Sequence, residues 1–341
     1  MDATPKGRKK SRATMMDVAE LAGVSQATVS LVLNGSPDVK LAETTRERVR
    51  TAARDLGYSL PRRKSRKLPD TQPVLLFLAD EISSDPWMTA AFDGAQKKAL
   101  EFGLNAVLAV AADAENEAVV MEQFQSTPLA GIIYGTILTR QVRPSAQVTR
   151  HPTVLLNGWD KDRSLHSVVP GDALGGRTAV EHLLDRGRTR IALINGLEGL
   201  EATQDRARGY RQALASREIP FDPVLVRDGN WEARSGYEET KALLALETRP
   251  DAIFCANDPM AFGCYEAIRE AGLKIPDDIS VIGFDDREIA KDMHPPLTTM
   301  VLPHYEMGEI AAEILIDMAG GHNTVPIQVK VDCPLVVRAS V

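Results

Sequence analysis

Short apolar runs recur at intervals of roughly 20 to 35 residues from residue 73 onward, and this recurrence limits the possible folds more than any other feature. Helical segments with capping residues lie between most of the runs. Strands that alternate with helices at this spacing form parallel sheets with helices on both faces. The predicted strands are 74–79, 106–110, 131–134, 154–156, 191–194, 224–226, 252–255 and 280–282.

The number of these units predicts two lobes. They are too many for one compact doubly wound sheet with connections of these lengths, so the body at 73–341 is expected to be α/β, with two similar doubly wound parallel-sheet lobes. A chain of 341 residues also leaves room for a small additional module before the body.

The N-terminal stretch 13–34 predicts two short helices joined by a tight turn at Gly23. Thr14 and Ser25 are placed to cap them, and glycine supplies the backbone freedom that ends the first helix. A third helix is expected at about 43–56. Two helices this short need the third for stability, and small and amide side chains on the second helix suit the major groove of DNA.

Charge is distributed unevenly along the chain. Residues 1–70 hold 15 lysines and arginines against 8 acidic residues, whereas the rest holds 25 against 39. A basic head on an acidic body is typical of a polyanion-binding module attached to a body that stays away from the polyanion. The segment 59–72 carries a basic run and reads as a linker, either a charged tether or a DNA-contacting hinge.

The helical stretch resembles the helix-turn-helix of the LacI/GalR family of bacterial repressors. The resemblance is carried by D-V-A-x-x-A-G-V-S from Asp17, T-V-S-x-V-L-N from Thr28, and Tyr58. It implies an all-α DNA-binding head at 13–58, a hinge at 59–72 whose Leu68 wedges into the minor groove, and a pseudo-palindromic double-stranded operator. The implied DNA contacts are Thr14, Ser25, Gln26, Ala27, Thr28, Ser30, Leu31, Asn34, Arg62 and Leu68.

The resemblance continues through the body, for example at 187–194, 256–263 and 278–286. It implies an effector-binding core similar to periplasmic sugar-binding proteins, with two lobes joined by three crossovers and neither lobe continuous in sequence. It also implies a homodimer and a small-molecule effector, a sugar or sugar derivative, between the lobes. The chain shows no C-terminal leucine heptad, so a dimer is expected rather than a tetramer.

Several polar residues stand directly after predicted strands, where a ligand of such a fold binds. The resemblance assigns effector hydrogen bonds to Arg206, Asn257 and Asp285, and ring contacts to Trp87 and Trp231. With the strand-end polar residues added, the predicted effector contacts are Asp80, Trp87, Asn157, Arg206, Trp231, Asn257 and Asp285.

Neighbouring polar residues are given other interpretations. Asp258 and Asp286 are expected to cap the helices that follow them. His304 is either a further effector contact or an ordinary surface or core histidine, and the role of Asp172 is left open, because it lies one place away from the usual acidic position.

Two other classes of protein share part of this pattern. An enzyme also fits two α/β lobes, but the sequence lacks the G-x-G-x-x-G, G-x-x-x-x-G-K-[ST], H-E-x-x-H and G-x-S-x-G motifs. A periplasmic binding protein fits neither the basic head nor the missing signal segment, so a cytoplasmic location without membrane association is expected. The widely spaced Cys255, Cys264 and Cys333 read as buried apolar residues, and no metal or cofactor is expected.

Overall fold

The computed structural model describes residues 15–24, 26–33, 43–56, 73–82, 86–321 and 325–341, and the chain divides into two compact units, Met1–Lys67 and Leu68–Val341. The first unit contains the three predicted helices: α1 (Met15–Ala22), α2 (Gln26–Leu33) and α3 (Glu43–Asp55). They bury one small core made of Val18, Ala19, Ala22, Val29, Val32, Val49, Ala52 and Ala53. Each helix is short, so this shared core is what stabilises the unit.

The first lobe of the second unit is built on a parallel sheet with the order β11-β5-β4-β3-β1-β2. Helices α4 (Trp87–Glu101) and α12 (His304–Ala319) contribute to the core on one face of the sheet, and α5 (Ala114–Gln123) and α6 (Ala146–Thr149) to the core on the other. Its strands are β1 (Val74–Ala79), β2 (Asn105–Val110), β3 (Leu129–Val142), β4 (Thr153–Asp160), β5 (His166–Pro170) and β11 (Gln328–Val331).

The second lobe has the order β12-β10-β9-β8-β6-β7, parallel except where β12 pairs antiparallel with β10. Helices α9 (Ala233–Leu244) and α10 (Asp258–Glu270) cover one face, and α7 (Asp172–Asp185) and α8 (Glu201–Ser216) the other. The short α11 (Glu288–Asp292) follows β9. Its strands are β6 (Ile191–Asn195), β7 (Val226–Asp228), β8 (Ala252–Cys255), β9 (Ser280–Asp285), β10 (Thr298–Val301) and β12 (Leu335–Val336).

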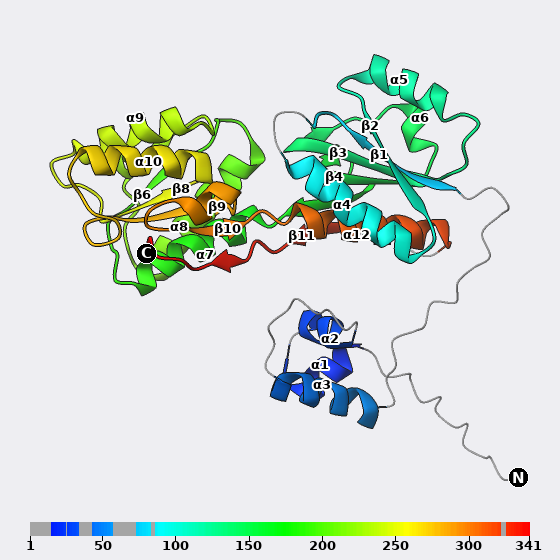
Figure 1. The fold of residues 1–341 in the computed structure, drawn as a ribbon, viewed down its shortest axis with the longest axis horizontal. Helices are drawn as coiled ribbons and strands as arrows, with labels where there is room; N and C mark the ends of the chain where they lie inside the picture. The colour runs from blue at the N-terminus through cyan, green and yellow to red at the C-terminus, as the bar shows by residue number, and fades with distance from the viewer. Residues whose placement is uncertain (1–14, 25, 34–42, 57–72, 83–85, 322–324) are drawn as a thin grey trace, which may run out of the picture. The chain divides into compact units, whose positions relative to one another are not determined.

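The chain passes between the lobes three times, as predicted: from β5 to α7, from β10 to α12, and from β11 to β12 (Figure 1). Neither lobe is continuous in sequence. The orange-red α12, for example, lies beside the cyan α4, far from it along the chain (Figure 1).

One predicted strand is wrong. Residues 224–226 were expected to be extended, but Pro223–Leu225 forms a 3-10 turn and β7 begins only at Val226. The Asp222 side chain accepts a hydrogen bond from the backbone N–H of Val224, and proline occupies the first turn, so local capping outweighs the apolar pattern. Strands β5, β10, β11 and β12 were not predicted.

Glycines allow two helix pairs to approach backbone to backbone. A Cβ at Gly308 of α12 would lie 1.9 Å from the Ala91 carbonyl oxygen of α4, and a Cβ at Gly209 of α8 would lie 2.2 Å from that of Ala173 on α7. Both distances are far below van der Waals contact. These crossings fix α12, which begins at His304, and α8, which carries Arg206.

All three cysteines are buried, as predicted, and none forms a disulfide. Over the described part of the chain, no helix is long and apolar enough to cross a bilayer.

Candidate functional site

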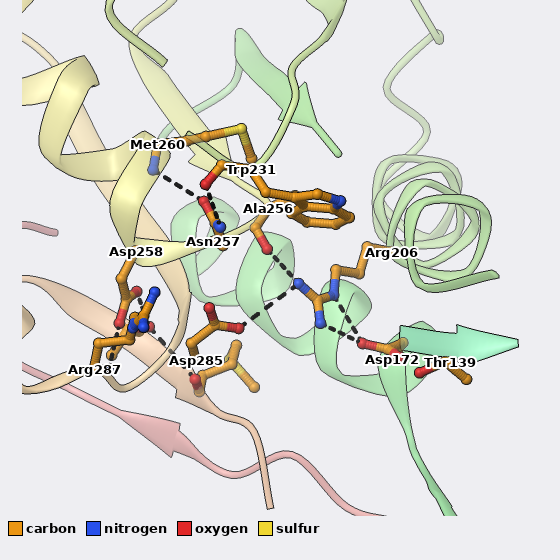
Figure 2. Close-up of polar contacts among 12 residues, drawn as sticks. Thr139, Asp172, Arg206, Trp231, Ala256, Asn257, Asp258, Met260, Asp285 and Arg287 are labelled. Carbon is orange, nitrogen blue, oxygen red and sulfur yellow. Dashed lines mark hydrogen bonds and ion pairs between the residues drawn. The ribbon is translucent and has the colours of Figure 1, made fainter. Parts of the chain in front are cut away.

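Arg206 lies at the centre of a buried polar cluster in the second lobe (Figure 2). Its Nε and Nη2 donate to Asp172 Oδ1, each at 2.8 Å, and its Nη1 donates to the carbonyl oxygen of Ala256. Nη1 also lies 4.0 Å from Asp285 Oδ1. The guanidinium stacks on the Phe284 ring of β9 at 3.7 Å. Its polar partners therefore come from α7 and from the residue that follows β8, and its apolar support comes from β9.

This cluster keeps the arginine charged. Burial alone would lower the pKa of Arg206, but the carboxylates of Asp172 and Asp285 outweigh it and raise the pKa. Burial raises the pKa of Asp172, and the charge and hydrogen bonds of Arg206 oppose that rise. A guanidinium held between carboxylates presents donors and acceptors side by side, an arrangement that suits neighbouring hydroxyl groups.

Asn257 and Trp231 are joined to this cluster through the backbone. Asn257 caps α10, with its Oδ1 accepting from the Met260 N–H at 2.9 Å, and its Nδ2 donates to the Trp231 carbonyl oxygen at 2.9 Å. The Trp231 ring lies over Gly196, where a Cβ would come within 1.9 Å of it, and over the Arg206 guanidinium at 5.5 Å. Glycine at 196 is therefore needed for this ring position.

The backbone is strained at this edge of the sheet. Trp231 has φ +71° and Asp285 has φ +118°, values that side-chain-bearing residues rarely adopt. Such residues cost about 1–3 kcal/mol each and gather at functional sites. The strain therefore supports a functional role for the strand ends of the second lobe.

Asp258 and Asp286 do not cap helices, contrary to the prediction. Asn257 holds the capping position of α10, so Asp258 instead accepts from Thr299 Oγ1 at 2.6 Å and from the Arg287 N–H at 2.7 Å. Burial raises the pKa of Asp258 to about 7. Asp286 forms an ion pair with Arg338 at 2.5 Å.

The side chains of Asp80 and Asn157 form hydrogen bonds with other residues of the first lobe, to which both belong. Asp80 accepts from the Ile137 N–H at 3.0 Å and from Arg140 Nη2 at 2.9 Å. Both amide hydrogens of Asn157 go to backbone carbonyls of the 136–140 segment, and its Oδ1 accepts from Thr139 Oγ1 at 2.6 Å. In this structure the two side chains brace that segment.

Trp87 joins the lobes. Its ring stacks on His304 of the same lobe, with the centroids 5.6 Å apart, and the guanidinium of Arg287 from the second lobe lies 5.8 Å from it. A second contact between the lobes pairs Asp205 Oδ2 with Lys330 Nζ at 3.5 Å.

His304 is a buried, uncharged histidine, only 2% exposed. Burial and the nearby charge of Arg206 lower its pKa to about 3. Neither ring nitrogen has a hydrogen-bond partner among the described residues. Buried polar atoms are nearly always satisfied in proteins, so this side chain calls for an explanation.

The structure thus gathers Arg206, Asn257, Asp285 and Trp231, and connects Trp87 to them through Arg287. Sequence reasoning missed Asp172 as the main partner of Arg206, and no local pattern links two residues so far apart in the chain. Among the described residues, no group of histidine, cysteine and acidic side chains is placed to hold a metal ion.

The predicted DNA contacts are only partly described. Gln26, Ala27, Thr28, Ser30 and Leu31 all lie on α2, the second helix of the head. The remaining predicted contacts, Thr14, Ser25, Asn34, Arg62 and Leu68, lie outside the described residues.

A three-helix head joined to a two-lobed body with a buried polar cluster at its strand ends defines the class of ligand-responsive DNA-binding proteins. Residues 14–60 match the family described as bacterial regulatory proteins, lacI family, and residues 180–341 match the periplasmic binding protein-like domain. The ribose operon repressor of Escherichia coli K12 is 34% identical, covering 89% of this chain and 92% of its own length. The chain belongs to the LacI family.

Further relatives agree. The Escherichia coli transcriptional repressor CytR is 32% identical over 98% of this chain and 97% of its own. The lac repressor dimer bound to operator and an anti-inducer superposes with a TM-score of 0.67 at 29% identity, covering 96% of this chain and 98% of that one. The complex of the regulator CelR with cellobiose superposes at 0.66 with the same identity, covering 96% and 100%.

Proposed function

We propose that this chain is a homodimeric, cytoplasmic transcriptional repressor whose affinity for a pseudo-palindromic operator is set by a sugar bound between its two lobes. The observation that carries the proposal is the buried Arg206–Asp172–Asp285 cluster at the strand ends of the second lobe, within a chain that belongs to the LacI family. The protein acts by coupled binding and has no catalytic role.

The DNA side of the proposal assigns 13–58 to the reading head, 59–72 to the hinge and 73–341 to the effector-binding and dimerising body. Helix α2 enters the major groove, with Gln26, Ala27 and Leu31 reaching base edges. Leu68 of the hinge wedges into the minor groove, and the basic residues around it contact phosphates. The lac repressor dimer bound to its operator, among the similar structures, supports operator binding by a dimer.

The effector side assigns hydrogen bonds to Arg206, Asp285 and Asn257, and a ring contact to Trp231. Trp87, Asp80 and Asn157 close the site from the first lobe. The ribose operon repressor and the CelR–cellobiose complex among the similar proteins support a sugar. Carboxylate and guanidinium groups beside an indole ring also suit sugar hydroxyls and an apolar sugar face.

Operator selection followed by titration tests the proposal. The full-length protein selects its operator from a random duplex pool, and anisotropy then measures operator affinity with and without D-ribose or cellobiose. We expect a palindromic consensus and an affinity that one of the sugars changes. Asp285→Asn is expected to bind the operator normally and to lose the response. An Asp285→Asn protein that responds like the wild type would remove this site from the proposal.

The hinge is tested separately. Leu68→Ala is expected to weaken operator binding while leaving the salt-dependent binding to a random duplex nearly unchanged, because the wedge acts only on a bent, specific site. Equal losses on both duplexes would show that residues 59–72 are only a charged tether.

A further inference from the structure

Two buried side chains and one partly buried side chain near Arg206 keep buried polar atoms without a partner among the described residues. These atoms are both ring nitrogens of His304, Nε1 of Trp231 and Oδ1 of Asn195, and no described residue hydrogen-bonds to any of them. His304 and Asn195 are 2% and 5% exposed. Buried polar atoms of this kind are rare in folded proteins and mark places where something else supplies the bond.

Contacts already described connect these side chains. Asn195 ends β6 and precedes Gly196, over which the Trp231 ring lies. The same ring lies over the Arg206 guanidinium. His304 stacks on Trp87, and the guanidinium of Arg287 from the second lobe lies 5.8 Å from the Trp87 ring. Ser280 also has a hydroxyl without a partner among the described residues. This residue begins β9, at the opposite end of the strand from Asp285, so it is not part of this set.

The hydrogen-bonding characters of these atoms are mixed. Uncharged His304 has one donor and one acceptor nitrogen, the Trp231 Nε1–H can only donate, and the Asn195 oxygen can only accept. The set therefore offers donors and acceptors in equal number. A hydroxyl group both donates and accepts, so neighbouring hydroxyls of a sugar ring match it.

A phosphate does not match this set. The oxygens of a phosphate dianion only accept, so a phosphate group placed against this set would leave the Asn195 oxygen and one His304 nitrogen unmatched. The cation at the centre is also already neutralised, since Arg206 lies between the carboxylates of Asp172 and Asp285. The other nearby guanidinium, that of Arg287, lies over the Trp87 ring.

We propose that His304, together with Asn195 and Trp231, determines effector specificity by selecting an uncharged polyhydroxyl ligand over its phosphate ester. This inference rests on the proposed function and adds His304 and Asn195 to the site. His304 acts by direct contact with the ligand, held in place by its stacking on Trp87.

Calorimetric titration of the full-length protein tests the selection. The uncharged probes are D-ribose and adenosine, and their charged counterparts are ribose 5-phosphate and adenosine 5′-monophosphate. We expect at least one uncharged probe to bind, and its phosphate ester to bind at least about tenfold more weakly, because two acceptors lose their donors. A phosphate ester that binds as tightly would overturn the selection but leave effector control intact.

Variants of His304 test the residue itself. His304→Phe keeps the stack on Trp87 and removes both nitrogens, so affinity for the bound probe is expected to fall about tenfold, whereas His304→Gln, which keeps a donor and an acceptor, is expected to stay within about threefold. His182→Phe, at a partly buried histidine on α7 that also has an unpartnered nitrogen, is the matched control and is expected to bind normally.

Thermal melting confirms that each variant is folded. Wild-type affinity in a folded His304→Phe protein would exclude the residue from the site. Loss of response in Asp285→Asn alongside that result would show that the proposed function stands while this inference fails.

Discussion

Arg206 is buried together with its ion-pair partner Asp172, so replacing it affects the stability of the protein. The guanidinium is only 4% exposed and holds Asp172, which is itself buried. Arg206→Ala would leave that carboxylate without its partner, and breaking a buried pair in this way costs about 3–5 kcal/mol. We expect urea denaturation of the full-length variant to show a loss of this size.

Asp285→Asn serves as the comparison for that measurement. Asp172 keeps its pair in this variant, and asparagine has the same shape as the aspartate that already occupies this backbone position at φ +118°. We expect the unfolding free energy to fall less in Asp285→Asn than in Arg206→Ala. If both variants lost stability equally, the Asp172 pair would not be the source of the effect.

His304 predicts a specific dependence of stability on pH. Its pKa falls from an ordinary 6.5 to about 3 on folding, through burial and then the charge of Arg206. Below pH 6.5 the unfolded chain therefore binds a proton that the folded chain does not. The free energy of unfolding is therefore unaffected by His304 above pH 6.5. As the pH falls from 6.5 toward 3, keeping His304 neutral lowers this free energy by about 1.4 kcal/mol per pH unit.

The measurement compares wild type and His304→Phe by urea denaturation between pH 7.5 and pH 5. Relative to the variant, the wild type is expected to lose about 2 kcal/mol of unfolding free energy over this range, most of it below pH 6.5. The same pH profile in both proteins would mean that His304 is not held neutral.

At the scale of elements, strands with continuous apolar runs were predictable and polar ones were not. Strand β8 was predicted to the residue from Ala252–Cys255, which is buried throughout. Strand β10 contains Thr298 and Thr299, both fully buried, whose hydroxyls accept from the Arg338 N–H and donate to Asp258 respectively. Those partners lie about 40 residues away, so no local pattern reveals the strand.

The same limit applies to the site. Strand-end positions and the family resemblance pointed to Arg206, Asn257 and Asp285, which the structure does gather. Asp172, the main partner of Arg206, lies 34 residues earlier in the sequence, on another helix. His304 starts a helix that returns to the first lobe only after the chain has crossed twice. Tertiary contacts of this kind have no periodic signature in sequence.

The crossing of α4 and α12 predicts the effect of one added methyl group. A Cβ at Gly308 would lie 1.9 Å from the Ala91 carbonyl oxygen, so Gly308→Ala must push the helices apart. Overpacking costs about 1–3 kcal/mol, and the shift would also disturb the stack of His304 on Trp87. Denaturant unfolding and sugar titration of the variant are expected to show both losses.

Gly320→Ala is the matched control in the same helix. Gly320 is exposed at the C-terminal end of α12 with φ −76° and ψ −5°, a conformation that alanine adopts without strain. Unchanged or slightly raised stability is expected there. A Gly308→Ala protein as stable as this control would show that the two helices can separate at no cost.

For the molecule as a whole, function depends on how the two lobes are held relative to each other. Described contacts across them include Arg287 over Trp87 and the ion pair of Lys330 with Asp205. Asp205 precedes Arg206 on α8, so the ion pair links the proposed effector site directly to the first lobe. An effector that changes the lobe orientation must make or break such contacts.

Lys330→Ala therefore tests whether the orientation of the lobes links sugar binding to operator binding. The lysine is more than half exposed, so its ion pair contributes at most about 1 kcal/mol to one orientation. The factor by which sugar changes operator affinity is expected to shift by up to about fivefold, with the fold and the melting temperature nearly unchanged. By reciprocity, the operator must change sugar affinity by the same altered factor, which calorimetry measures independently.

Lys241→Ala is the matched control, because Lys241 forms its ion pair with Glu270 inside the second lobe and is similarly exposed. It removes the same charge from the protein without touching a contact between lobes. In Lys241→Ala, the factor by which sugar changes operator affinity is expected to equal that of the wild type. If the two lysine variants behaved alike, net charge would account for the shift, and the orientation of the lobes would not be what links sugar to operator.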